Sequence, residues 1–156
     1  MLYIVGTPIG NLGDITYRAV EIMRNVDGVV AENPSHTKKL LNHLGISTPL
    51  YRYHEQSKPT ERERIIELLV QGQNLALVTD AGTPGVSDPG GQLVEEATNA
   101  GVEISPIPGP SAVTALLSVA GMPTDAYLFL GFLPKKKGRK TLIDEIKSLD
   151  VPIVLF

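Results

Sequence analysis

The chain has 156 residues, an apolar fraction of 42%, a charged fraction of 20% and a net charge of −3, which are ordinary values for one globular domain with or without a fragment of a second. It contains no cysteine, which excludes disulfides, thiolate metal sites and cysteine nucleophiles. We find no signal peptide and no apolar run of the ~18–20 residues that a membrane span needs, so we expect a cytoplasmic protein without a membrane partner.

Short apolar runs alternate along the chain with longer amphipathic segments, a pattern typical of β-α-β units with a parallel sheet. Strands are predicted at residues 2–5, 28–31, 50–53, 75–79 and 102–107. Helices are predicted at residues 17–25, 36–44, 61–71, 92–100 and 111–120, with Ser35 and Thr60 as the N-caps of the second and third. We therefore expect an α/β fold with a five-stranded, mainly parallel sheet, in which residues 50–53 form an edge strand.

The sequence changes character after residue 123. Residues 1–134 contain 8 Lys/Arg and 14 Asp/Glu, whereas residues 135–156 contain 6 Lys/Arg and 3 Asp/Glu. A helical pattern at 141–149 is followed by an apolar run at 151–156 that resembles a core strand. We therefore expect a first domain at residues 1–123, and a linker with the truncated start of a second α/β domain at residues 124–156.

Three loops rich in glycine and proline follow predicted strands, at residues 6–14, 79–90 and 106–112. A parallel sheet places all of them at its carboxyl edge, where α/β proteins bind ligands, and glycine lets the backbone approach a ligand closely. The glycines of the first loop do not have the spacing of the dinucleotide or phosphate-loop fingerprints. Together the loops favour a small-molecule cleft over three turns of strict geometry.

Polar side chains in these regions leave several interpretations open. The histidines at 36, 43 and 54 lack the spacing of a metal site, so no metal is expected. Asp80 and Asp88 either hydrogen-bond within their own loop or contact a ligand. The basic cluster is either a phosphate contact or a solubilising linker. It consists of Lys135, Lys136, Lys137, Arg139 and Lys140.

Three motifs together resemble the tetrapyrrole methylase superfamily: GTPIGNLGD at 6–14, DAGTPGVSDPG at 80–90 and PIPGPSA at 106–112. Within it they are most similar to the RsmI-type 16S ribosomal RNA ribose 2′-O-methyltransferases, which act on a cytidine. Further agreement lies at residues 31–32, 36–41, 53–55 and 131–134. One departure is the NPS sequence at 33–35, where the family usually carries an acidic residue, threonine and arginine.

The resemblance implies a two-domain, homodimeric enzyme that uses S-adenosyl-L-methionine and acts on 16S rRNA of the small ribosomal subunit. It gives the basic cluster a role in RNA binding, and Asp80, Glu32 and His36 are weak candidates for a catalytic base. Two alternatives stay open: methylation of a tetrapyrrole carbon in a corrin or porphyrin, and a non-catalytic half-enzyme. The implied cofactor contacts are Thr7, Pro8, Asp80, Ala81, Gly82, Thr83, Ser87, Asp88, Pro110 and Ser111.

Overall fold

The structure is a computed structural model that describes residues 1–54 and 59–156. Its internal contacts divide the chain into two units, Met1–Ser111 and Ala112–Phe156, which we describe separately. The helix α5 (Ala112–Ser118) belongs to the second unit by these contacts, whereas the sequence boundary after residue 123 assigned it to the first. Glu55, the last residue of the YHE motif at 53–55, lies outside the described residues.

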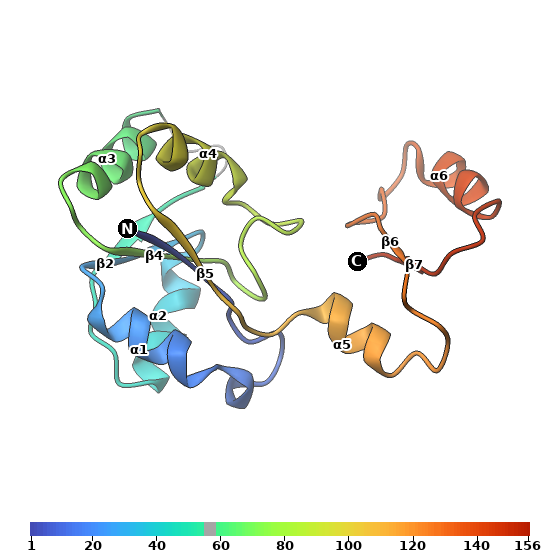
Figure 1. The fold of residues 1–156 in the computed structure, drawn as a ribbon, viewed down its shortest axis with the longest axis horizontal. Helices are drawn as coiled ribbons and strands as arrows, with labels where there is room; N and C mark the ends of the chain where they lie inside the picture. Colours follow the sequence, from blue (N-terminus) through green and yellow to red (C-terminus); the bar gives the residue numbers. More distant parts are fainter. Residues whose placement is uncertain (55–58) are drawn as a thin grey trace. The chain divides into compact units, whose positions relative to one another are not determined.

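The first unit contains a five-stranded sheet in which every neighbouring pair is parallel (Figure 1). The strand order is β3-β2-β4-β1-β5, so β3 is an edge strand, as predicted. The fold class expected from the alternating apolar runs is confirmed. The strands are β1 (Leu2–Val5), β2 (Gly28–Ala31), β3 (Leu50–Arg52), β4 (Leu75–Val78) and β5 (Ile104–Ile107).

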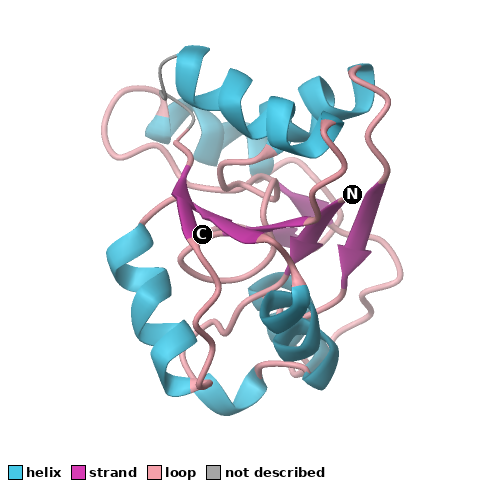
Figure 2. Cartoon of the chain, turned by 90° about the vertical axis from the view of Figure 1, so that its left-hand side faces the viewer, coloured by secondary structure: helices cyan, strands magenta, loops and turns pink. Residues whose placement is uncertain are grey.

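Helices cover both faces of this sheet, and each face has its own apolar cluster (Figure 2). The helices α1 (Tyr17–Asn25) and α2 (Pro34–His43) contribute Met23 and Leu41 to one cluster. The helices α3 (Pro59–Val70) and α4 (Gly91–Asn99) contribute Ile65 and Leu93 to the other. Every residue of β2 and β4 is buried, which explains why their sequences are continuous apolar runs.

Two helix starts differ from the prediction, and a proline is the reason in each case. In α2 the N-cap is Asn33, whose side-chain oxygen accepts a hydrogen bond from the His36 amide at 3.3 Å. Ser35 was therefore the wrong N-cap, and Thr60 was wrong as well because α3 already begins at Pro59. The fixed φ of proline suits the first position of a helix, so both helices start earlier than the Ser/Thr rule predicts.

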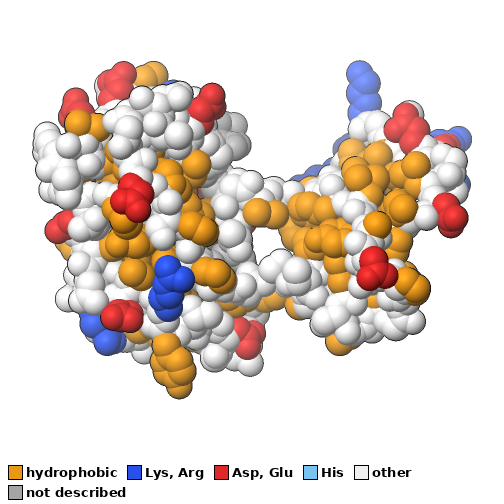
Figure 3. Space-filling view, in the orientation of Figure 1, with side chains coloured by type: hydrophobic (Ala, Val, Ile, Leu, Met, Phe, Trp, Pro, Cys, Tyr) orange, Lys and Arg blue, Asp and Glu red, His pale blue; other side chains and the backbone are white. Residues whose placement is uncertain are grey.

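The second unit contains α5, a parallel pair of strands and the helix that joins them. The strands β6 (Leu128–Phe129) and β7 (Ile153–Val154) pair in parallel, and α6 (Arg139–Ile146) lies between them in sequence. Hydrophobic side chains gather on the visible face of this unit (Figure 3). Within residues 1–54 and 59–156, no helix is long and apolar enough to cross a membrane.

Candidate functional site

The loops that follow β1 and β4 are joined to each other at the carboxyl edge of the sheet. The backbones of Thr7 and Gly82 form an isolated antiparallel bridge, with N···O distances of 2.9 and 3.1 Å. The Thr7 hydroxyl donates to the Thr79 carbonyl oxygen at 3.2 Å, and Thr7 is 1% exposed. Thr7 therefore fixes the first loop against the second by both its backbone and its side chain.

The loop after β5 is held against the same place by two glycines. The Gly6 amide donates to the Ile107 carbonyl oxygen at 3.3 Å, directly before the third loop. A Cβ built on Gly6 would lie 2.9 Å from the Gly109 Cα, and one built on Gly109 would lie 2.9 Å from the Gly6 carbonyl oxygen. All three glycine-rich loops thus meet at one point of the sheet edge, and Pro110 and Ser111 directly follow Gly109 there.

The loop at residues 79–90 turns sharply because four of its residues have positive φ angles. Gly82, Gly85 and Gly90 have φ of +80°, +82° and +137°. Ser87 has φ of +56°, and it is the one non-glycine residue with a positive φ in the described part of the chain. A serine in this region stores strain, which is a feature of functional loops. The loop leaves Asp80 and Ala81 exposed at its start.

Two cavities lie at this edge, and among the described residues Asp80 is the one that lines both. The larger has a volume of about 510 Å³ and the smaller about 40 Å³. Of the predicted site residues, Thr7, Pro8 and His36 line the smaller cavity, and Glu32 lines the larger one. The described residues that line the larger cavity are Glu32, Asn33, Pro34, Ser35, Arg52, His54 and Asp80.

The structure thus brings the three candidate bases to one edge, where Glu32 and His36 each line one cavity and Asp80 lines both. Pro110 and Ser111 line neither of the two cavities. Arg52 was missed by sequence reasoning, although one signal was present: it lies within the edge strand predicted at residues 50–53. In the structure it pairs with Ala31, which directly precedes Glu32. Among residues 1–54 and 59–156, no group of three or more His, Asp or Glu side chains is arranged to hold a metal ion.

Asp88 lies close enough to Asp80 for their charges to interact. Burial raises the pKa of the Asp88 carboxyl above its usual value of 3.8, a hydrogen bond from the Thr79 side chain opposes the rise, and the charge of Asp80 adds to it. The loop therefore brings two carboxyl groups near each other, and burial is the main reason that the pKa of Asp88 is raised.

We expect this carboxyl to make stability depend on pH in a defined direction. Because its pKa is higher in the folded than in the unfolded protein, Asp88 stabilises the fold at low pH and loses that contribution as pH rises above 3.8. The difference in unfolding free energy, Asp88→Asn minus wild type, should therefore increase as pH rises from about 3 to about 7. Urea unfolding across this range measures it, and a difference that stays constant would contradict the prediction.

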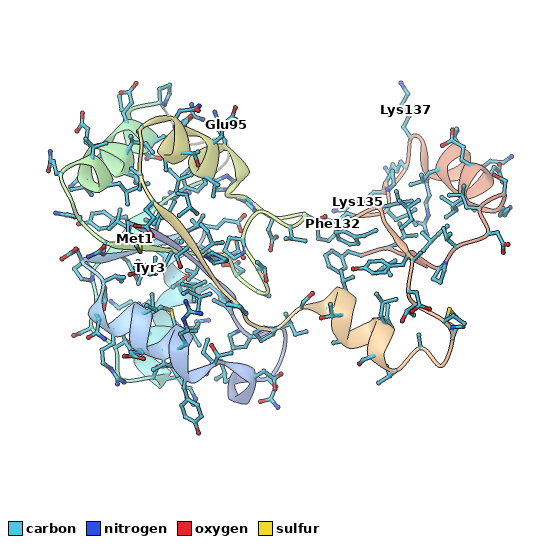
Figure 4. All side chains as sticks on the ribbon, in the orientation of Figure 1. Met1, Tyr3, Glu95, Phe132, Lys135 and Lys137 are labelled. Carbon is cyan, nitrogen blue, oxygen red and sulfur yellow. The ribbon has the colours of Figure 1, made fainter. Side chains whose placement is uncertain are left out.

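The basic cluster lies in the second unit and is exposed throughout. Lys135, Lys136 and Lys137 precede α6, and Arg139 and Lys140 occupy its first turn. Figure 4 shows the Lys137 side chain extending away from the ribbon. Cations are unfavourable at a helix N-terminus, so these charges do not serve the stability of α6.

Comparison with known proteins identifies the family. Residues 1–156 match the model of the family described as Tetrapyrrole (Corrin/Porphyrin) Methylases, and the chain belongs to this family.

Individual relatives are informative about the branch within the family. The chain is 44% identical over 156 residues to the ribosomal RNA small subunit methyltransferase I of Halalkalibacterium halodurans, covering 99% of this chain and 54% of that protein. It is 44% identical over 155 residues to the protein of the same name in Thermotoga maritima, covering 99% and 70%. The chain therefore spans about half the length of the first relative.

A solved structure supports the fold. The crystal structure of diphthine synthase superimposes with a TM-score of 0.77 at 20% identity, and the match covers 99% of this chain and 63% of that one.

Proposed function

We propose that this protein is an S-adenosyl-L-methionine-dependent methyltransferase that methylates the ribose 2′-hydroxyl of a cytidine in 16S rRNA of the small ribosomal subunit. The observation that carries the proposal is 44% identity, over 99% of the chain, to proteins named ribosomal RNA small subunit methyltransferase I. A ribosomal substrate goes with a cytoplasmic location. We also propose the homodimer that the family resemblance implies.

The three loops at the sheet edge would form one side of the cofactor-binding site. S-adenosylmethionine supplies an electrophilic methyl group when bound. The smaller cavity, about 40 Å³, has room for little more than one water of ~30 Å³. The cofactor would therefore lie mostly over the exposed backbone of Asp80 and Ala81, with Gly82, Thr83, Ser87 and Asp88 shaping the same loop. Thr7 and Pro8 of the first loop would contact the cofactor from one side. Pro110 and Ser111 would contact it from the third loop.

Asp80 is the best-placed base. A ribose hydroxyl is a poor nucleophile unless a nearby group accepts its proton. The carboxylate of Asp80 lines both cavities, so it can take that proton from a hydroxyl placed where they join. Glu32 and His36 each line only one of the two. We therefore assign the proton transfer to Asp80.

The basic cluster is proposed to contact the RNA backbone, which gives a prediction about salt. Replacing Lys135, Lys136, Lys137, Arg139 and Lys140 by glutamine should lower RNA affinity. It should also flatten the plot of log affinity against log salt by about 0.7–0.9 for each phosphate that is no longer neutralised. Filter binding between low and physiological salt measures both quantities. Replacing Lys38 and Lys39, two exposed lysines of α2, is the control for general charge loss. Unchanged RNA binding in the cluster variant would return the cluster to the role of a linker.

The experiment that tests the function is methyl transfer from radiolabelled S-adenosylmethionine by the full-length protein. Small ribosomal subunits lacking the modification should gain label, and nuclease digestion should recover it as 2′-O-methylcytidine. Label in a tetrapyrrole instead would establish the carbon methylation that the family name allows. Cofactor binding by calorimetry without transfer to either substrate would establish the non-catalytic module.

A further inference from the structure

We propose that the larger cavity binds the target nucleotide itself, with Arg52 holding its phosphate and Glu32 reading the exocyclic amine of cytosine. This inference rests on the proposed function and adds to it a substrate subsite and a determinant of base specificity. Sequence analysis treated Glu32 only as a weak candidate base and did not single out Arg52.

Strand register places the two side chains and Asp80 in a row. Ala31 of β2 pairs with Arg52 of β3 and, on its other side, with Val78 of β4. Glu32 directly follows Ala31, and Asp80 follows Val78 by two residues. Neighbouring strands lie about 4.8 Å apart, so the three groups fan across about 10 Å of the sheet edge. The cavity of about 510 Å³ lies among them.

The larger cavity is lined by both negative and positive side chains, so it suits a ligand that carries both an anionic group and hydrogen-bond donors. Two carboxylates, Glu32 and Asp80, face the same cavity as one guanidinium, Arg52. Arg52 is exposed, and the ion pairs found among residues 1–54 and 59–156 do not include it. A planar guanidinium with free donors matches the oxygens of a phosphate. The first residues of α2 also line the cavity, so the positive end of that helix adds to the attraction.

The opposite end of the ligand must offer hydrogen-bond donors to a carboxylate. Glutamate accepts from the N4 amine of cytosine, whereas uracil presents the O4 acceptor at that position and would be repelled. The cavity volume of about 510 Å³ falls in the range of roughly 300–1,000 Å³ that suits a small ligand. It suits a single nucleotide removed from its stack, and RNA is read in this way when its bases are unpaired.

The position of Asp80 agrees with this placement. The strand order puts Asp80 on the side of Glu32 away from Arg52, so a nucleotide with its phosphate at Arg52 and its base at Glu32 must turn its ribose toward β4 to reach Asp80. Asp80 lines the same cavity and also the smaller one that contains Thr7 and Pro8 of the proposed cofactor wall. The ribose hydroxyl then lies where the two sites meet. In this arrangement the residues of the larger cavity select the nucleotide, and Asp80 accepts the proton of its ribose hydroxyl.

The test uses the full-length protein and small ribosomal subunits reconstituted with either cytidine or uridine at the methylated position. Arg52→Ala should raise KM for the subunit by roughly 10–100-fold, the loss expected for a hydrogen bond to a charged group, with S-adenosylmethionine affinity within twofold of wild type. Arg52→Lys should recover part of this loss, because lysine keeps the positive charge but lacks the paired donors of the guanidinium. Glu32→Gln should reduce the preference for cytidine over uridine by roughly 5–150-fold.

Control variants and distinct outcomes separate the nucleotide-subsite proposal from the proposed methyltransferase function on which it rests. Arg64→Ala and Glu21→Gln change exposed residues of α3 and α1 outside the cavity and should behave like wild type. If the wild-type protein methylates no RNA, the proposed function fails. If it methylates RNA but the KM of Arg52→Ala or the base preference of Glu32→Gln is unchanged, the nucleotide subsite is wrong. If Arg52→Ala instead weakens cofactor binding, the cavity holds the amino-acid end of the cofactor, which also overturns the proposal.

Discussion

Asp80→Asn is expected to lower the rate constant of methyl transfer by about 10²–10⁴-fold, the range for loss of a general base. Asparagine keeps the size and shape of the side chain but cannot accept the ribose proton. Because the backbone of the 79–90 loop is held by Thr7 and not by this carboxylate, the fold of the site should persist. Single-turnover transfer at saturating substrate measures the chemical step, and calorimetry should show cofactor affinity within about threefold of wild type, well under 1.4 kcal/mol.

The controls for this result are other acidic or neighbouring residues. Glu95 lies exposed on α4, where Figure 4 labels it, and Glu95→Gln should transfer methyl at the wild-type rate. His36→Gln tests the rival base in the smaller cavity. A wild-type rate in Asp80→Asn together with a collapse in His36→Gln would move the proton transfer to the imidazole. Loss of cofactor binding in Asp80→Asn would make Asp80 a binding residue.

The centre of the sheet was predictable because every residue of β2 and β4 is buried. Continuous apolar runs such as residues 75–78 have few alternatives in an α/β chain, and the glycine-rich loops had to follow their carboxyl ends. The role of Thr7 was less accessible. Its hydroxyl donates to the Thr79 carbonyl oxygen 72 positions away, and no local pattern encodes a contact at that distance along the chain.

Arg52 shows why part of the site could not be read from the sequence. A charged residue at the end of an edge strand is usually solvated, and the neighbouring motif at 53–55 does not include Arg52. Its significance comes from the register that pairs it with Ala31, next to Glu32, and from the strand order that brings Asp80 to the other side. Both are long-range properties. Charge and spacing alone also could not separate Asp80 from Glu32 and His36, whereas in the structure Asp80 lines both cavities and the other two line one each.

The junction of Gly6 and Gly109 should be the most sensitive point of the loop cluster to added volume. A Cβ on Gly6 would lie 2.9 Å from the Gly109 Cα and 3.2 Å from its amide nitrogen. These are backbone atoms of a neighbouring loop and cannot rotate away as a side chain would. We therefore expect Gly6→Ala to lower the free energy of unfolding by about 1–3 kcal/mol, the usual cost of overpacking. Urea unfolding monitored by circular dichroism measures this loss.

Gly6→Ala should also move the first and third loops apart, because the added Cβ can avoid the Gly109 backbone only if the third loop shifts. Both loops belong to the proposed cofactor site. Cofactor affinity should then fall more than it does in a variant of similar stability altered elsewhere. Ile65→Val, a core change in α3 expected to cost about 0.5–1.5 kcal/mol, provides that comparison. Gly91→Ala is the matched glycine control, since a Cβ there meets nothing within 4 Å and φ is not positive. Equal stability of Gly6→Ala and Gly91→Ala would contradict the close approach. Normal cofactor binding by a destabilised Gly6→Ala would instead show that the third loop forms no part of the cofactor site.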